Sequence, residues 1–318
     1  MKALYFAHGN PELYDLVRGH VPSGCTLLTL DTDTVAERLE KLREAEVIVL
    51  AGAYLDRRYI AAAPRLRLVN FQGVGYHDAV DVDALAERGI ALAIAPGGTG
   101  EGVSEHTIMM MLATYKRLAF VDAEIRRGVW HAHDMRTESR QLYGKTVGIL
   151  GLGRIGREVA RRLRAFGVEL IYTDIANFPR ELEEELAVRR VSFDELLARS
   201  DVLTLHVPLT PETRHLMNAV SLAQMKPGAV LINCARGPIV DSAALAAALE
   251  KGHLSGAGLD VMEVEPPAHP GPFDHFRNVV MTPHIAPGTI DAMHMKMADV
   301  FANVRRLMEG APLADRIV

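Results

Sequence analysis

The sequence predicts an α/β protein built from two doubly wound parallel sheets. Short apolar runs alternate with amphipathic segments along the whole chain, which is typical of strands and crossover helices in parallel sheets. The chain has 318 residues, more than a single hydrophobic core usually serves. A glycine-rich turn between an apolar run and a helical segment lies mid-chain, at residues 151–156. This turn begins a second strand–helix series and therefore a second domain.

The first sheet is expected from residues 1 to about 97. Apolar runs of strand length lie at residues 2–7, 26–30, 47–50, 66–71 and 90–94. Segments with helical spacing lie between them, at residues 34–45, 57–63 and 82–88. Thr34 and Glu37 form a capping pattern at the start of the first of these helices. Residues 95–102 are rich in glycine and predict a hinge, and residues 103–117 predict a long helix after it.

The second sheet is expected to start at the mid-chain turn. Further strands are predicted at residues 169–173, 189–191, 202–207, 229–234, 255–259 and 279–282, with helices between them. A long helix at residues 289–308 follows the last strand, and we expect it to return to the first sheet. The predicted substrate (catalytic) domain is therefore residues 1–100 and 288–318. The predicted nucleotide-binding domain, residues 101–287, is inserted into it, and the gap between two such domains is the default active site.

The mid-chain turn has the sequence Gly151-Leu152-Gly153-Arg154-Ile155-Gly156. In a turn of this kind the first glycine permits the bend, the second lets the backbone approach a pyrophosphate, and the third lets the helix pack on the strand. The helix N-terminus then binds the phosphates. Asp174 ends the next strand, close to the offset expected for the acid that binds a ribose 2′-hydroxyl. These features together predict a Rossmann-like dinucleotide site.

Composition narrows the possible functions. The net charge is −5 and the basic residues are scattered, which argues against a nucleic-acid partner. No apolar run approaches the roughly 20 residues of a membrane span, and the N-terminal apolar stretch fits a first strand better than a signal peptide. Cys25 and Cys234 are the only cysteines, so we expect a cytoplasmic protein without disulfides. His131 and His133 lack further ligands nearby, and no metal site is predicted.

Four polar residues follow the strands at one edge of the predicted nucleotide sheet: Arg236, Asp260, Glu265 and His284. An arginine can grip a carboxylate with two hydrogen bonds and stays charged. A histidine can donate or accept a proton near neutral pH, and a carboxylate beside it would fix its tautomer. Taken alone, each residue also has a purely structural interpretation. Arg236 could cap a turn, Glu265 could be a solvated loop acid, and His284 could be a structural histidine. Their position on one edge favours hydride-transfer chemistry on a hydroxy or keto acid.

Four segments resemble the signature blocks of the D-2-hydroxyacid dehydrogenase family. They are the glycine turn with Asp174, residues 233–237, residues 258–266 and residues 282–285. The resemblance covers essentially the whole chain. It implies an NAD-dependent oxidoreductase that interconverts a 2-keto acid and a D-2-hydroxy acid by hydride transfer.

The resemblance also implies residue roles. Arg236 would bind the substrate carboxylate and carbonyl, and His284, paired with Glu265, would be the proton donor in reduction. The implied cofactor site comprises Gly151, Gly153, Arg154, Ile155, Gly156, Asp174, Val207, Pro208, Cys234, Ala235 and Asp260, with Asp260 at the nicotinamide carboxamide. The implied substrate site comprises Tyr54, Val74, Gly75 and Arg236, with the backbone N–H groups of Val74 and Gly75 on the carboxylate.

Some details depart from the family pattern. Residues 285–289 replace the usual glycine-glycine-serine ending, and Pro287 lacks a backbone donor. Residues 51–55, where the family places substrate contacts, contain no base. We therefore expect a substrate other than 3-phosphoglycerate, with a small or moderately apolar side chain. Arg57 and Arg58 lie nearby in the sequence and could bind a phosphate, so 3-phosphoglycerate remains an alternative.

The residues after the second strand of the nucleotide unit predict the choice between NAD and NADP. Asp174 would repel the 2′-phosphate of NADP, and Ile175 and Ala176 supply no cation, so NAD is predicted. Two other functions remain open: an NAD-sensing interaction protein of corepressor type, and a dehydrogenase of an unusual donor such as formate or phosphite. A homodimer is the family expectation, formed through residues 119–142 with Trp130 as an anchor.

Overall fold

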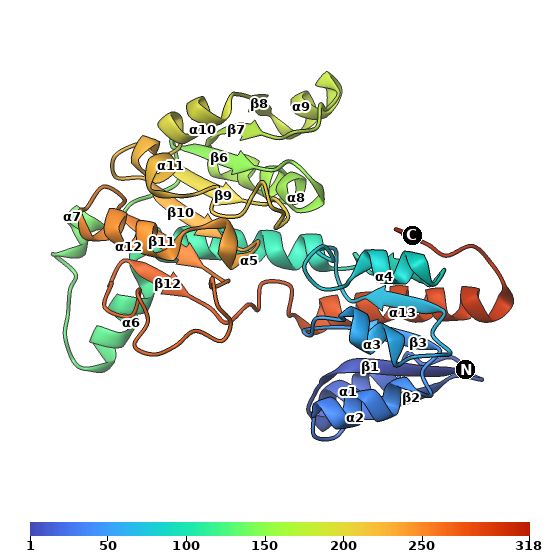
Figure 1. The fold of residues 1–318 in the computed structure, drawn as a ribbon. Helices are drawn as coiled ribbons and strands as arrows, with labels where there is room; N and C mark the ends of the chain where they lie inside the picture. The colour runs from blue at the N-terminus through green and yellow to red at the C-terminus, as the bar shows by residue number, and fades with distance from the viewer. The chain divides into compact units, whose positions relative to one another are not determined.

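A computed structural model describes residues 1–318, the whole chain. The chain forms two compact units (Figure 1). Unit 1 comprises Met1–Thr99 and Thr289–Val318, and unit 2 comprises Gly100–Gly288. Each unit contains one parallel sheet with a hydrophobic core on each face. The predicted α/β class with two doubly wound sheets is confirmed.

Unit 1 contains a five-stranded sheet in the order β2-β1-β3-β4-β5, and all neighbouring strands are parallel. The strands are β1 (Lys2–His8), β2 (Thr26–Leu30), β3 (Val47–Leu50), β4 (Leu68–Phe71) and β5 (Ala91–Ile94). Strands β3 and β5 are buried along their whole length. They read as continuous apolar runs because helices cover both faces of a parallel sheet.

The helices of unit 1 divide between the two faces of its sheet. One face packs against α2 (Val35–Leu42), α3 (Arg57–Ala61) and α4 (Val82–Glu87). The other face packs against α1 (Pro11–Arg18) and α13 (Ile290–Glu309). The sequence interpretation missed α1, although Asn10 caps its N-terminus and Pro11 occupies its first turn.

Helix α13 joins unit 1 as the sequence predicts. Met297, Val300, Phe301 and Val304 form its buried face over the sheet. The side-chain amide of Asn303 donates to the side-chain oxygen of Asn70 on β4 at 3.0 Å. The last helix therefore completes the core that the first 99 residues begin.

Unit 2 contains a seven-stranded parallel sheet in the order β12-β11-β10-β9-β6-β7-β8. The strands are β6 (Thr146–Leu150), β7 (Glu169–Thr173), β8 (Val188–Arg190), β9 (Val202–Leu205), β10 (Val230–Asn233), β11 (Gly256–Leu259) and β12 (Val279–Met281). The strand order reverses between β6 and β9. Ligands of open α/β sheets bind beyond the carboxyl ends of the strands at such a reversal.

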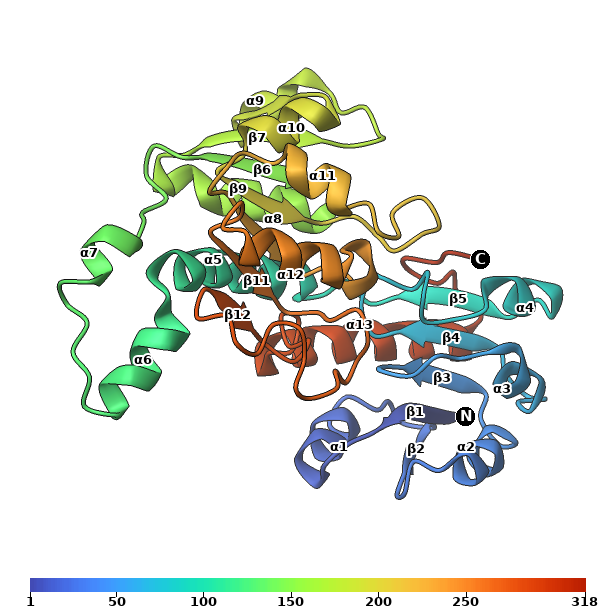
Figure 2. The same cartoon turned by 60° about the vertical axis from the view of Figure 1, so that its left-hand side comes forward.

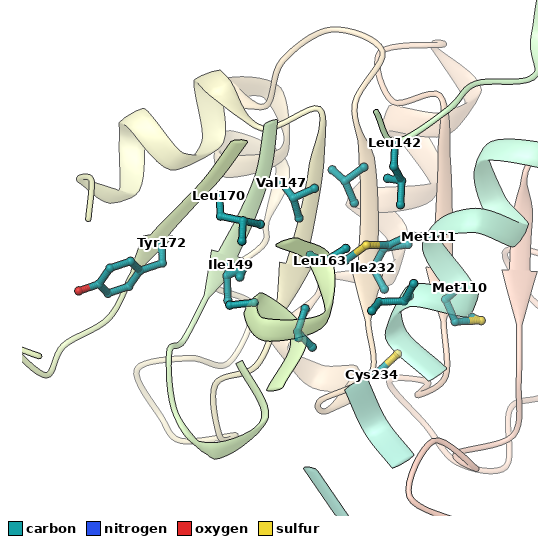
Figure 3. Close-up of a cluster of buried hydrophobic side chains, with 14 of the residues drawn as sticks. Met110, Met111, Leu142, Val147, Ile149, Leu163, Leu170, Tyr172, Ile232 and Cys234 are labelled. Atoms are coloured by element: carbon teal, nitrogen blue, oxygen red, sulfur yellow. The ribbon is translucent and has the colours of Figure 1, made fainter. Parts of the chain in front are cut away.

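Helices cover both faces of the sheet in unit 2. One face packs against α5 (Thr99–Lys116), α8 (Arg154–Leu163) and α9 (Arg180–Leu186). The other face packs against α10 (Phe193–Arg199), α11 (Ala219–Gln224) and α12 (Ser242–Glu250). Figure 3 shows the first of these cores, where Met110 and Met111 of α5 lie among side chains of the strands and of α8. Met110 and Met111 therefore fill the core on this face of the sheet.

Helix α5 begins at Thr99, inside the glycine-rich segment that the sequence predicts as a hinge. Gly100 and Gly102 are helical there, because glycine lowers helix propensity without forbidding a helix. Two short helices, α6 (Leu118–Arg126) and α7 (Met135–Glu138), stand away from the sheet of unit 2 (Figures 1 and 2). None of the helices combines the length and the apolar composition that crossing a bilayer requires.

Candidate active site

The glycine turn connects β6 to α8. A Cβ on Gly151 would lie 2.7 Å from the carbonyl oxygen of His206, and φ at Gly151 is +95°. A Cβ on Gly156 would lie 2.1 Å from the carbonyl oxygen of Gly151. Neighbouring backbone therefore excludes a side chain at both positions. A Cβ on Gly153 would meet no atom within 4 Å, so the space beside Gly153 is open to a ligand.

The N-terminus of α8 faces this turn. Gly153 is its N-cap, and no side chain caps it. The helix begins with Arg154, Ile155 and Gly156. An N-terminus without a side-chain cap attracts anions through its backbone N–H groups and its dipole. Together with the open space at Gly153, these residues fit a pyrophosphate.

Asp174 follows β7 and is hydrogen-bonded to the glycine turn. Its Oδ2 atom accepts the N–H of Leu152 at 2.7 Å, and its Oδ1 atom accepts the N–H of Ala176 at 2.8 Å. The carboxylate is therefore anchored beside the glycine turn, where the sequence predicts it. Ile175 next to it is fully exposed.

Val207, Pro208, Cys234 and Ala235 follow the ends of β9 and β10. Val207 packs against the glycine turn, since its Cγ1 atom would lie 3.0 Å from a Cβ on Gly151. Cys234 is buried, and this burial raises the pKa of its thiol to about 12. A thiol with such a pKa is inert as a nucleophile, so Cys234 can only line a site.

Arg236 stands at the end of β10. The side-chain amide of Asn233 donates to the carbonyl oxygen of Arg236 at 2.9 Å, and its oxygen accepts the N–H of Ala235 at 3.0 Å. A short 3₁₀ helix, Gly237–Ile239, follows. A Cβ on Gly237 would lie 1.8 Å from the carbonyl oxygen of Met262. The loop that carries Arg236 is thus pressed against the loop after β11.

His284 and Glu265 form a hydrogen-bonded pair on the loops after β12 and β11. The His284 Nδ1 atom lies 2.8 Å from Glu265 Oε2, and Glu265 Oε1 accepts the N–H of Met262 at 2.9 Å. Both side chains are somewhat more than one-third exposed. Burial alone would raise the pKa of Glu265, but hydrogen bonds from His284 and Met262 outweigh it and hold the pKa below its usual value.

Asp260 lies behind His284, and its carboxylate is almost fully buried. It accepts hydrogen bonds from the hydroxyl of Thr282 at 2.6 Å and from the N–H groups of Ile285 and Ala286, both at 2.9 Å. Its carbonyl oxygen accepts the N–H of His284 at 2.6 Å. His284 has a left-handed backbone, with φ +54°. Asp260 therefore fixes the conformation of the segment that carries His284.

His106, on α5, completes this group. Its Nε2 atom lies 3.0 Å from the Thr282 hydroxyl and 3.3 Å from Asp260 Oδ1. Burial raises the pKa of Asp260, but the hydrogen bonds from His106, Thr282 and the two backbone donors lower it below its ordinary value. The sequence interpretation missed both His106 and Thr282. Their separation of 176 residues leaves no local signal of the contact.

The structure thus brings Arg236, Asp260, Glu265 and His284 together at the carboxyl edge of β10, β11 and β12, in unit 2. The remaining predicted substrate residues belong to unit 1. Tyr54 is 54% exposed, and Val74 and Gly75 follow β4. Gln72, just before them, is held by the Tyr5 hydroxyl at 2.8 Å and contacts the Met293 sulfur at 2.9 Å.

Comparison with known proteins identifies the family. A family model described as D-isomer specific 2-hydroxyacid dehydrogenase, NAD binding domain, matches residues 108–286, more than half of the chain. The chain belongs to this family. The glycine turn, Asp174 and the group around His284 all lie within or next to the matched domain. The predicted family is confirmed, and so is a nicotinamide dinucleotide as the cofactor.

Individual relatives differ in what their names say they act on. The D-3-phosphoglycerate dehydrogenase of Methanocaldococcus jannaschii is 39% identical over 287 residues, which cover 90% of this chain and 54% of that protein. This chain therefore spans about half the length of the phosphoglycerate dehydrogenases it matches. The glyoxylate reductase of Thermofilum pendens is 39% identical over 281 residues, 86% of this chain and 81% of that protein. Among solved structures, apo D-mandelate dehydrogenase from Rhodotorula graminis is similar to this chain, with a TM-score of 0.88 and 28% sequence identity. The match covers 100% of this chain and 97% of that one.

Proposed function

We propose that this protein is an NAD-dependent dehydrogenase that interconverts a small 2-keto acid and a D-2-hydroxy acid. The observation that carries the proposal is the pair of His284 and Glu265, 2.8 Å apart, on the same strand edge as Arg236. An acid–base group and a fixed cation are the two functions that reduction of a keto acid requires from side chains. Membership of the D-isomer specific 2-hydroxyacid dehydrogenase family supports the same reaction.

His284 is proposed to donate the proton. Its Nδ1 atom faces Glu265, so Nε2 is the ring nitrogen left to hold the exchangeable proton. NADH, when bound, would supply the hydride for the carbonyl carbon. Nε2 of His284 would give its proton to the carbonyl oxygen, which becomes the hydroxyl group. Glu265 stabilises the imidazolium form before the transfer, and the oxidation of the hydroxy acid runs the same step in reverse.

Arg236 is proposed to bind the substrate carboxylate and to polarise the carbonyl group. A guanidinium stays charged at all working pH values and presents two parallel donors to a carboxylate. The close fit of Gly237 against Met262 supports this role, because it fixes the loop of Arg236 relative to that of Glu265. The backbone N–H groups of Val74 and Gly75 are proposed as further partners of the carboxylate.

The cofactor site is proposed to use the residues around the glycine turn. Gly153 and the N-terminus of α8, at Arg154 and Ile155, would hold the pyrophosphate. Asp174 would hydrogen-bond the adenosine ribose diol and so favour NAD over NADP. Val207, Pro208, Cys234 and Ala235 would line the site, and Asp260 would meet the nicotinamide carboxamide.

The substrate is proposed to be a small 2-keto acid without a phosphate group. The segment at residues 51–55 contains no base, and the nearby Arg57 already pairs with Glu87 at 2.5 Å and with Asp81 at 3.6 Å. A phosphate would have to compete with two carboxylates for this guanidinium. The similarity to glyoxylate reductases over most of their length supports the same choice.

A substrate screen tests the proposal. The enzyme is mixed with NADH and, in separate reactions, with glyoxylate, hydroxypyruvate, pyruvate, bulkier 2-keto acids and 3-phosphohydroxypyruvate, and the loss of NADH absorbance is followed. We expect the highest kcat/KM with one of the small unphosphorylated acids and a product of D configuration. NADH binding without turnover of any keto acid would contradict the proposal and favour an NAD-sensing protein.

The protein is also proposed to be a cytoplasmic homodimer. Helix α6 has no buried residue, and Leu118, Ile125 and Trp130 are 53%, 51% and 75% exposed. Exposed apolar side chains on one projecting segment are typical of a subunit contact. Both cysteines are free thiols, which suits a reducing compartment. Light scattering should give twice the chain mass for the wild type and the chain mass for Trp130→Ser; a monomeric wild type would refute the dimer.

A further inference from the structure

Strand β8 places an arginine beside the acid that is proposed to select NAD. Arg190 is the last residue of β8 and pairs with Tyr172 of β7, two residues before Asp174. Its Nη2 atom donates to the carbonyl oxygen of Asp174 at 2.7 Å, and Nη1 donates to the side-chain oxygen of Asn177. The residue is exposed. Reasoning from Ile175 and Ala176 alone could not find this cation, because it comes from the neighbouring strand.

The carboxylate of Asp174 is held by backbone donors of the glycine turn and of its own turn. Both of its oxygens already accept backbone N–H groups, from Leu152 at 2.7 Å and from Ala176 at 2.8 Å. In the turn between β7 and α9, backbone N–H groups therefore fix the carboxylate of Asp174, and the guanidinium of Arg190 is bonded to the carbonyl oxygen of the same residue. A guanidinium has five donors, and its hydrogen bonds to Asp174 and Asn177 leave Arg190 the capacity to bind an added anion.

We propose that Arg190 is a specificity-determining residue of the cofactor site. Arg190 gives the adenosine end of this site an affinity for a 2′-phosphate. The negative charge of Asp174 opposes that affinity. This inference rests on the proposed cofactor site. A 2′-phosphate carries close to two negative charges and accepts bidentate arginine hydrogen bonds readily. Asp174 repels that phosphate, while Arg190, which is bonded to the same turn from β8, attracts it. The selectivity for NAD is thus a balance between the negative charge of Asp174, after β7, and the positive charge of Arg190, at the end of β8.

Binding of two small ligands tests the proposal without any turnover. Adenosine 2′,5′-bisphosphate and 5′-AMP differ only in the 2′-phosphate, and calorimetry gives the Kd of each. The proteins are the wild type, Arg190→Gln, Asp174→Asn, and the double variant Asp174→Asn/Arg190→Gln. Asn is chosen at position 174 because it keeps the size of the side chain and one acceptor for the backbone N–H groups.

The expected result is a change in the ratio of the two affinities. Asp174→Asn should raise the affinity for the bisphosphate relative to 5′-AMP by about tenfold or more, since it removes one repelling charge. Adding Arg190→Gln should abolish most of that gain. Arg190→Gln alone should weaken the bisphosphate by several-fold and leave 5′-AMP nearly unchanged. The ratio of kcat/KM for NADPH and NADH should follow the same order.

Arg189→Gln is the matched control. Arg189 precedes Arg190 on β8, but its guanidinium pairs with Glu195 at 3.2 Å and Glu169 at 3.6 Å, away from Asp174. In the Asp174→Asn background this variant should keep the full gain. A gain that survives Arg190→Gln, or that Arg189→Gln also removes, would overturn the proposal. Should Asp174→Asn not fold, the single variant Arg190→Gln decides by the bisphosphate affinity alone. A wild type that binds neither ligand would instead refute the proposed cofactor site.

Discussion

The Nδ1 atom of His284 lies 2.8 Å from Oε2 of Glu265, whose other oxygen accepts the N–H of Met262 at 2.9 Å. The carboxylate is therefore held by a backbone donor on one side while it holds the imidazole on the other. A carboxylate that is fixed in this way orients the ring and selects its tautomer. The geometry leaves the other ring nitrogen, Nε2, for the proton transfer proposed above.

Replacing this carboxylate should slow the chemical step. Glu265→Gln keeps the shape but removes the charge that stabilises the imidazolium, so we expect kcat to fall by about 10- to 100-fold with little change in NADH affinity. Steady-state rates and NADH fluorescence titrations measure the two quantities. Glu263→Gln is the control, because Glu263 lies on the same loop but bonds His215 at 2.7 Å instead. Equal losses of kcat in the two variants would argue against a specific role of Glu265.

Gly153→Ala separates cofactor binding from folding. A Cβ at this position meets no protein atom, so the free energy of unfolding should stay the same within experimental error. The methyl group should nevertheless weaken NADH binding by about tenfold or more, because it fills the space proposed for the pyrophosphate. Gly156→Ala is the contrasting variant and should unfold at a lower temperature. Normal NADH affinity in Gly153→Ala would show that the pyrophosphate lies elsewhere.

Gly237→Ala should disturb Arg236 without touching the cofactor turn. The added Cβ would lie 1.8 Å from the carbonyl oxygen of Met262, so the loop of Arg236 has to move. We expect a higher KM for the keto acid and a kcat lower by about tenfold or more. The glycine turn itself should be unaffected, since β10 is separated from β6 by β9. Because Cys234 and Ala235 of the same loop line the proposed cofactor site, we expect the Kd of NADH to rise, but by a smaller factor than the KM of the keto acid. An unchanged KM would contradict the proposed role of Arg236.

The strands could be predicted from sequence with little error. The boundaries at 26–30 and 47–50 agree with β2 and β3, because buried parallel strands are short apolar runs bounded by polar residues. Helix α1 was missed, since its eight residues carry a short apolar face that local reasoning reads as a loop. The early start of α5 was missed because glycines in a first helical turn look like a hinge.

The residues of the site could be predicted only where a motif marks them. The glycine turn and Asp174 lie within one strand–helix–strand unit, so their spacing is visible in the sequence. Contacts between different segments of the chain are not visible in the sequence. The contacts of His106 with Asp260 and of Arg190 with Asp174 are examples. These partners depend on which strands and helices become neighbours, and that is decided by the packing of the whole unit.

Acid should destabilise the protein partly through Asp260. The pKa of Asp260 in the folded protein lies below its ordinary value. Its contribution to the free energy of unfolding is therefore fully present above the unfolded pKa of about 3.9, and it is lost as the pH falls through the folded pKa. Asp260→Asn should therefore lower Tm near neutral pH and make the decline of Tm in acid less steep. Thermal unfolding from about pH 7 to about pH 3 measures this. Parallel curves for variant and wild type would contradict the account.

The most direct test of the proposed mechanism is the effect of His284→Asn on two quantities measured on one preparation. These are kcat for the best 2-keto acid with saturating NADH, and the Kd of NADH from fluorescence titration. If His284 donates the proton, kcat should fall by about 10²- to 10⁴-fold while the Kd of NADH changes by less than about threefold. A variant that keeps its kcat, or that loses NADH binding as severely as turnover, would contradict the mechanism.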